Sequence, residues 1–167
     1  MTKEQVRENA IKYFNGDDLA ANVWLDKYCL KDIETDPDQT IIRLATELAR
    51  VEKNYPNPVS YEQIYDLMKG YNKFVLGGSP LFGVGNNTTL STLGSCFVID
   101  SPEDSYGGIF RADQELAQLM KRRGGVGIDI SSLRPKRALV NNAASSSTGA
   151  VSFMERFSNT TREVALS

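Results

Sequence analysis

Histidine is absent from the 167-residue sequence, and cysteine occurs only twice, as Cys29 and Cys96. Without histidine, the chain cannot build a Ser-His or Cys-His hydrolase centre from its own residues. Two cysteines are too few for a disulfide framework or for a four-ligand zinc site, so we expect no metal site. Any chemistry of this chain is expected to use cysteine, carboxylates or groups that another chain supplies.

Excess positive charge and long apolar runs are also lacking. The formal net charge of −2 gives no broad basic surface for nucleic acid. The apolar runs are only a few residues long, far shorter than a membrane span. The polar, charged N-terminus has no signal-peptide core. We therefore expect a cytoplasmic protein that binds neither nucleic acid nor membranes.

The first part of the sequence contains three strong helix-start signals. Asp17 or Asp18 stands before an apolar run, and Asp36 precedes a proline at the first helical position. Ser60 with Gln63 three residues later forms a capping box. These signals predict a helical domain over residues 1–76.

The second part alternates between strand and helix patterns. Residues 77–92 are rich in Gly, Ser, Asn and Thr, which predicts a long loop. After it we expect a short buried strand over 96–100, a helix over 109–120, a strand over 126–130, a polar loop over 133–148 and a helix from 151. This βαβα order predicts an α/β fold with parallel strands in a domain over residues 77–167. Two strands are too few for an independent parallel sheet, so we expect the sheet to continue in residues outside this chain.

Five stretches, in the same order, resemble the large catalytic subunits of ribonucleotide reductases. They are LAANVWLDKY at 19–28, LGSCFVI at 93–99, LMKRRGGVGID at 119–129, LRPK at 133–136 and STGAVSFMERF at 147–157. The resemblance implies a helical N-terminal domain followed by the first βαβα portion of a ten-stranded α/β barrel. It also implies that the assembled enzyme reduces ribonucleotides to 2'-deoxyribonucleotides by radical chemistry.

The resemblance implies partners for this chain as well. The radical-bearing cysteine and the reducing cysteines of the family would lie in a remaining C-terminal part of the reductase. A thioredoxin-type reductant would act through that part. We therefore expect a fragment or split subunit that is inactive alone. The relatives' N-terminal ATP-binding module is expected to be absent here.

Cys96 is the catalytic candidate. Taken alone, a single cysteine on a strand is more often a small buried hydrophobic residue. In the family that this chain resembles, the matching cysteine faces the ribose 2'-position and gives up hydrogen and an electron as the 2'-hydroxyl leaves as water. It then forms a disulfide with a cysteine on a later strand. Cys29 has no such match and is interpreted as a core residue.

The same resemblance assigns two further sets of residues. The substrate-binding candidates are Ser79, Ser95, Gly124 and Gly125; ordinary turn chemistry is an equal alternative for Ser79. The effector-binding candidates are Asp104, Ser105, Tyr106, Arg134 and Lys136, for a deoxynucleoside triphosphate or ATP. Arginine suits phosphate because its planar fork makes bidentate hydrogen bonds. For Lys136, a solvated basic loop is the simpler interpretation.

The sequences of residues 104–109 and 158–164 are most similar to adenosylcobalamin-dependent relatives, which implies adenosylcobalamin as the cofactor. A class with a separate radical-generating subunit stays open. Two other functions also stay open: a non-catalytic nucleotide-binding regulatory module, and a structural fragment without activity. Nucleotide binding without turnover in the presence of every partner would indicate the first. A molten, poorly soluble chain would indicate the second.

Overall fold

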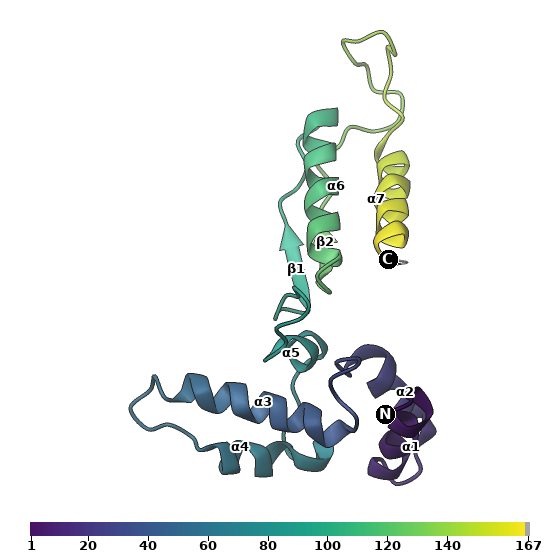
Figure 1. Ribbon diagram of the computed structural model, residues 1–167. Helices are drawn as coiled ribbons and strands as arrows, with labels where there is room; N and C mark the ends of the chain where they lie inside the picture. The colour runs from purple at the N-terminus through teal and green to yellow at the C-terminus, as the bar shows by residue number, and fades with distance from the viewer. Residues whose placement is uncertain (166–167) are drawn as a thin grey trace. The chain divides into compact units, whose positions relative to one another are not determined.

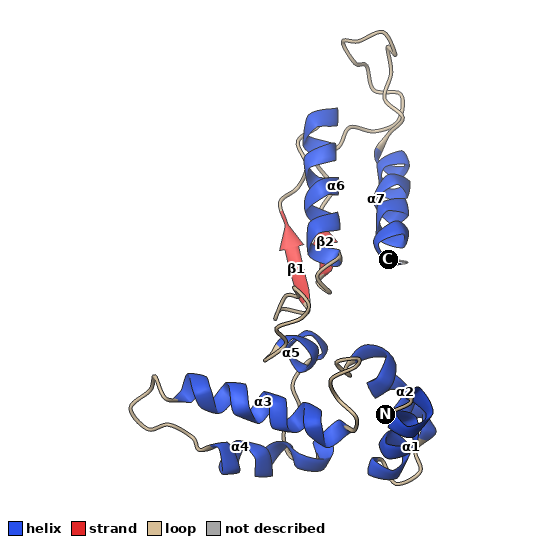
Figure 2. Ribbon diagram, viewed as in Figure 1, coloured by secondary structure: helices blue, strands red, loops and turns tan. Residues whose placement is uncertain are grey.

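The computed structural model describes residues 1–165 and divides the chain into two compact units, Met1–Leu93 and Gly94–Ser167 (Figure 1). The first unit is entirely helical, whereas the second combines helices with two strands (Figure 2). A mixed α/β architecture with a small parallel sheet is therefore confirmed. None of the described helices is long and apolar enough to cross a membrane.

The elements of the first unit are α1 (Lys3–Tyr13), α2 (Asp18–Lys27), α3 (Pro37–Glu52), α4 (Tyr61–Met68), the 3-10 helix η1 (Lys69–Tyr71) and α5 (Gly78–Gly83). Three helices of the first unit, α2, α3 and α4, begin at the predicted signals. The Asp17 side chain accepts a hydrogen bond from the Ala20 N–H, and Asp36 accepts from two N–H groups at the start of α3. Ser60 forms the predicted capping box with Gln63. These caps satisfy backbone donors that a helix start leaves unpaired.

Two hydrophobic clusters hold the first unit together. Helices α3, α4 and α5 share a core of Ile41, Leu44, Ala45, Ile64, Met68 and Leu81. Helices α1 and α2 pack through Ala10, Ala21 and Trp24, together with Cys29 just after α2. Cys29 is 6% exposed, which confirms that it is a core residue.

The predicted long loop over residues 77–92 is wrong in its first half, because α5 forms there. Leu81 of α5 packs into the α3–α4 core, so this segment belongs to the helical unit. The structure accordingly divides the chain after Leu93, whereas the sequence placed the boundary after residue 76. Two glycines and a proline within six residues give α5 a low intrinsic helix propensity, and tertiary contacts outweigh it.

The second unit is a βαβα arrangement. Strand β1 (Cys96–Ile99) pairs in parallel with β2 (Gly125–Ile128), and α6 (Tyr106–Met120) connects them. Helix α7 (Ala150–Ala165) follows a long loop and lies beside α6 (Figure 1). The buried core consists of Ile99, Ile109, Ala112, Leu116, Leu133 and Phe157.

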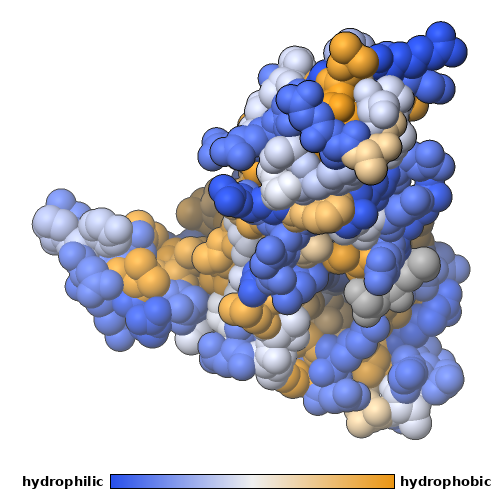
Figure 3. All heavy atoms as spheres, turned by 90° about the horizontal axis from the view of Figure 1, so that it is seen from above, coloured by the Kyte–Doolittle hydropathy of each residue, from blue (hydrophilic) through white to orange (hydrophobic). Residues whose placement is uncertain are grey.

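The described residues cover only one face of the two-stranded sheet. Phe97 and Ile99 lie toward the core, whereas Cys96 is exposed and Val98 is 87% exposed. The prediction of a buried strand is therefore wrong for this face, because the described residues cover only the side of the sheet that carries the helices. Apolar side chains are visible at the surface in Figure 3. An uncovered apolar strand face is typical of a surface that contacts more protein.

Candidate functional site

The exposed sheet face places Cys96 directly beside Gly125. The two residues are partners in the parallel ladder, and the Gly125 N–H donates to the Ser95 carbonyl oxygen at 2.8 Å. Paired residues of neighbouring strands project from the same face. Gly125 adds no side chain next to Cys96, and a Cβ atom there would lie 3.2 Å from the Ser95 carbonyl oxygen. Ser95, Cys96 and Gly125 are all exposed, so three predicted residues are brought together where a ligand can approach.

Gly124 has a packing function that the sequence did not indicate. It is buried, and a Cβ atom there would lie 2.8 Å from the Phe97 ring carbon Cε2. A Cβ atom on Gly94 would lie 2.7 Å from Cζ of the same ring. The ring of Phe97 therefore lies closely between two glycines. The absence of a side chain at Gly124 makes room for Phe97, while Gly125 keeps the exposed face open.

Ser79 belongs to the other unit. It lies in the first turn of α5 and is 5% exposed, so its hydroxyl is buried within the helical unit. Neither interpretation of Ser79 is decided by this placement.

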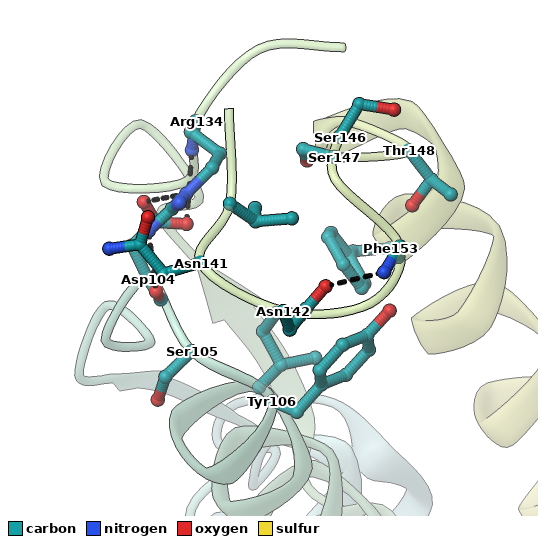
Figure 4. A pocket seen from close by; sticks show the side chains of 13 residues that line it. Asp104, Ser105, Tyr106, Arg134, Asn141, Asn142, Ser146, Ser147, Thr148 and Phe153 are labelled. Carbon is teal, nitrogen blue, oxygen red and sulfur yellow. Dashed lines mark hydrogen bonds and ion pairs between the residues drawn. The ribbon is translucent and has the colours of Figure 1, made fainter. Parts of the chain in front are cut away.

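A pocket of about 270 Å³ lies between the start of α6, the start of α7 and the loop that precedes α7 (Figure 4). Four of the five predicted effector residues line it: Asp104, Ser105, Tyr106 and Arg134. The other lining residues are Ile109, Val140, Asn141, Asn142, Ala144, Ser146, Ser147, Thr148 and Phe153. Aromatic and polar side chains therefore line one pocket, which is slightly smaller than typical small-molecule sites, whose volumes start near roughly 300 Å³.

Arg134 is held in this pocket by Asp104. Its Nε donates to Asp104 Oδ2 at 2.6 Å, Nη1 donates to the Leu139 carbonyl at 3.0 Å, and Nη2 donates to the Asp104 carbonyl at 3.3 Å (Figure 4). Burial raises the pKa of Asp104, but hydrogen bonds from Arg134 and its charge outweigh this, and the pKa is lowered. A guanidinium has five N–H donors, so these bonds leave two for an anionic ligand.

The other effector candidates differ in position. Ser105 is the N-cap of α6, where its Oγ accepts from the Gly108 N–H at 3.1 Å, so it has a local structural function as well. The ring of Tyr106 packs edge-to-face on Phe153 of α7 at 6.0 Å between centroids. Lys136 is exposed and does not line the pocket, in agreement with the interpretation as a solvated loop residue.

Sequence reasoning missed the asparagines and hydroxyl residues on the loop side of the pocket. The segment 141–148 was interpreted only as a polar loop, yet it forms one wall. Its composition was the available signal, since Asn and Ser cluster there without the charged residues common in solvated loops.

Comparison with known proteins identifies the second unit. Residues 94–166 match the family described as the ribonucleotide reductase barrel domain. The chain is similar to ribonucleotide reductase large subunits, and residues 94–166 carry the match to the barrel domain. The match begins at the first residue of the second unit and includes both strands, Cys96 and all the residues that line the pocket around Arg134.

Individual ribonucleotide reductases extend the similarity toward the N-terminus. The ribonucleoside-diphosphate reductase large chain of Neurospora crassa is 32% identical over 102 residues, which is 61% of this chain and 11% of that protein. Subunit alpha of Helicobacter pylori is 28% identical over 141 residues, covering 82% of this chain and 17% of that protein. The large subunit of Arabidopsis thaliana is 31% identical over 103 residues, 61% of this chain and 12% of that protein. The chain thus spans less than a fifth of the length of these relatives.

Proposed function

We propose that this chain supplies the redox thiol strand and an effector pocket to a ribonucleotide reductase. The observation that carries the proposal is the open position of Cys96 beside Gly125, within the region that matches the reductase barrel. The parallel pair of strands would be the first two of a ten-stranded barrel. The remaining C-terminal part of the reductase would cover the exposed face of β1 and provide the other strands.

The proposed chemistry balances as a two-electron reduction. The ribose C2' loses its hydroxyl as water and gains hydrogen. Two thiols, Cys96 and one cysteine of the remaining part, give two electrons and two protons and become a disulfide. A thioredoxin-type reductant would then restore both thiols by thiol–disulfide exchange. Because Cys96 is exposed and its ladder partner Gly125 has no side chain, a ribose could approach the sulfur.

Adenosylcobalamin is proposed as the radical source, because residues 104–109 and 158–164 are most similar to adenosylcobalamin-dependent relatives. When bound, it would generate the initiating radical in the remaining part of the enzyme. The described residues contain no group of three or more His, Cys, Asp or Glu side chains suited to a metal ion. This chain's own contribution would therefore be the thiol and the nucleotide contacts.

Reconstitution tests the proposed function. The 167-residue chain is combined with the remaining part of the reductase, a dithiol and adenosylcobalamin, and deoxyribonucleotide formation is followed from ribonucleoside diphosphates and triphosphates. The relatives are named for diphosphate substrates, so diphosphates are the first choice. We expect turnover only in the combined sample, since one redox thiol cannot complete the disulfide. Turnover by the chain alone would contradict the proposal. Nucleotide binding without turnover in every combination would favour a regulatory module.

The pocket around Arg134 is proposed to bind a deoxynucleoside triphosphate or ATP as effector. Arg134→Ala removes the guanidinium and is expected to weaken effector binding by about 1.5–3 kcal/mol, the usual contribution of a charged hydrogen bond. Calorimetric titration of the assembled enzyme measures the change.

Lys121→Ala is the matched control for this titration. Lys121 is an exposed residue at the end of α6, and it does not line the pocket. Both variants lose one positive charge, so a loss of affinity specific to Arg134→Ala reports the site and not the net charge. Equal affinities of both variants and the wild type would remove Arg134 from the effector site.

A further inference from the structure

Helix α5 is held at its C-terminal end by an arginine of α3. The Arg43 Nη2 donates to the Leu81 carbonyl at 3.2 Å, and Nη1 donates to the carbonyls of Phe82, at 3.4 Å, and Val84. The side chain of Arg43 is 11% exposed, so these bonds form in a largely buried setting. One guanidinium thus satisfies three carbonyl groups at the end of α5, where a helix otherwise leaves acceptors unpaired.

Glu34 fixes Arg43 from the other side. Its Oε1 accepts from Arg43 Nε at 2.8 Å, and its side chain is only 3% exposed. Its Oε2 accepts from the Leu30 N–H and from the Thr40 hydroxyl, both at 2.8 Å. Both carboxylate oxygens are therefore bonded, so the buried charge is compensated and the guanidinium is held in one orientation.

Helix α5 is not expected to be stable without contacts from the rest of the chain. It is six residues long, and its N-cap, Gly77, makes no side-chain capping bond. Short helices with glycine and proline are unstable without external contacts. The chain also leaves room for the arginine: a Cβ atom on Gly85, where φ is +70°, would lie 2.9 Å from Arg43 Cγ. The positive charge at the C-terminal end further stabilises the helix through its dipole.

We infer that Arg43 is a positioning residue that holds α5, and with it Ser79, in place for the substrate. The inference rests on the proposed function and on the family resemblance, which alone assigns Ser79 to the substrate. Ser79 lies in the first turn of the six-residue helix, so its place is fixed through the same backbone whose last carbonyls Arg43 binds. Glu34 acts one step further away, by orienting Arg43.

The stabilisation of α5 by the hydrogen bonds of Arg43 is tested with Arg43→Lys in the 167-residue chain. Lysine keeps a positive charge for Glu34 but lacks the planar fork that reaches several carbonyls. Hydrogen exchange of the amides in residues 78–84 is expected to become about tenfold faster or more, while exchange within α4 stays as in the wild type. Arg50→Lys, on the exposed side of the same helix α3, is the control and should change neither. Unchanged exchange in α5 of Arg43→Lys would overturn the inference.

The positioning role is tested in the assembled enzyme with a double-mutant cycle. Arg43→Lys and Ser79→Ala are each expected to raise KM for the ribonucleotide about fivefold to tenfold, with kcat within about twofold of the wild type. The double variant should be no worse than Ser79→Ala, since Arg43 acts through Ser79. A defect of Arg43→Lys that persists in full on the Ser79→Ala background would overturn the assignment, as would a wild-type KM.

Failure of the proposed function and failure of the role of Arg43 would give different results. Absence of reductase activity in the wild-type assembly would refute the proposed function, and the exchange experiment would then still decide whether Arg43 holds α5. A normal KM for Ser79→Ala in an active enzyme would refute the link from α5 to the substrate, while leaving the reductase function intact.

Discussion

Replacing Cys96 by serine is expected to abolish multiple turnover of the assembled reductase. Serine preserves the size and exposure of the side chain but cannot form a disulfide, so the two electrons for each turnover have no source. We expect the rate to fall by about 10²-fold or more, comparable with the loss of a catalytic acid or base. Folding and effector binding should persist, because Cys96 is exposed and does not line the effector pocket. Steady-state deoxyribonucleotide formation measures the loss.

Cys29→Ala is the control for this experiment. Cys29 is buried, and burial, followed by the charge of Glu34, raises the pKa of its thiol to about 11. A thiol with that pKa is almost entirely protonated near neutral pH and reacts poorly. The variant should lose packing free energy but keep normal turnover. One turnover without reductant, followed by mass spectrometry, should show Cys96 joined to a cysteine of the remaining part. Many turnovers by Cys96→Ser, or a native disulfide between Cys29 and Cys96, would contradict the catalytic assignment.

The starts of α2, α3 and α4 could be predicted because their cause is local. Asp17, Asp36 and Ser60 bind backbone N–H groups within three residues, so the sequence contains both partners of each contact. Helix α5 could not be predicted in this way. Its stabilising partner, Arg43, is separated from the carbonyl groups by 38 to 41 residues. The composition of α5 itself indicates a loop.

The candidate site, too, could be predicted only in part. The resemblance placed Asp104 and Arg134 among effector residues, and the structure brings them into one ion pair although 30 residues separate them. The wall formed by Asn141 and Asn142 was missed, because a polar loop has no periodic pattern that shows which way its side chains face. The exposure of Cys96 was also missed. A four-residue apolar strand does not reveal which face is covered, since covering depends on residues far away in the chain.

Loss of the buried ion pair between Glu34 and Arg43 is expected to destabilise the helical unit strongly. Arg43→Met leaves the Glu34 carboxylate buried, 3% exposed, without its positive partner. Breaking a buried pair in this way typically costs about 3–5 kcal/mol. Trp24 reports the unfolding of this unit specifically: it is the chain's single tryptophan, it is 2% exposed, and its Nε1 donates to Thr40 of the same network at 2.9 Å. Urea titration followed by tryptophan fluorescence gives the free energy of unfolding.

Two further variants separate the buried charge from other causes. Arg50→Met removes the same charge from the same helix, but the pair of Arg50 with Glu47 is exposed, so the urea midpoint should stay near that of the wild type. Glu34→Gln combined with Arg43→Met removes both charges. It should be more stable than Arg43→Met alone, because no isolated charge is then buried. A double variant as unstable as Arg43→Met would show that the lost carbonyl contacts of α5 dominate. Equal stability of Arg43→Met and Arg50→Met would show that the pair contributes nothing to the helical unit.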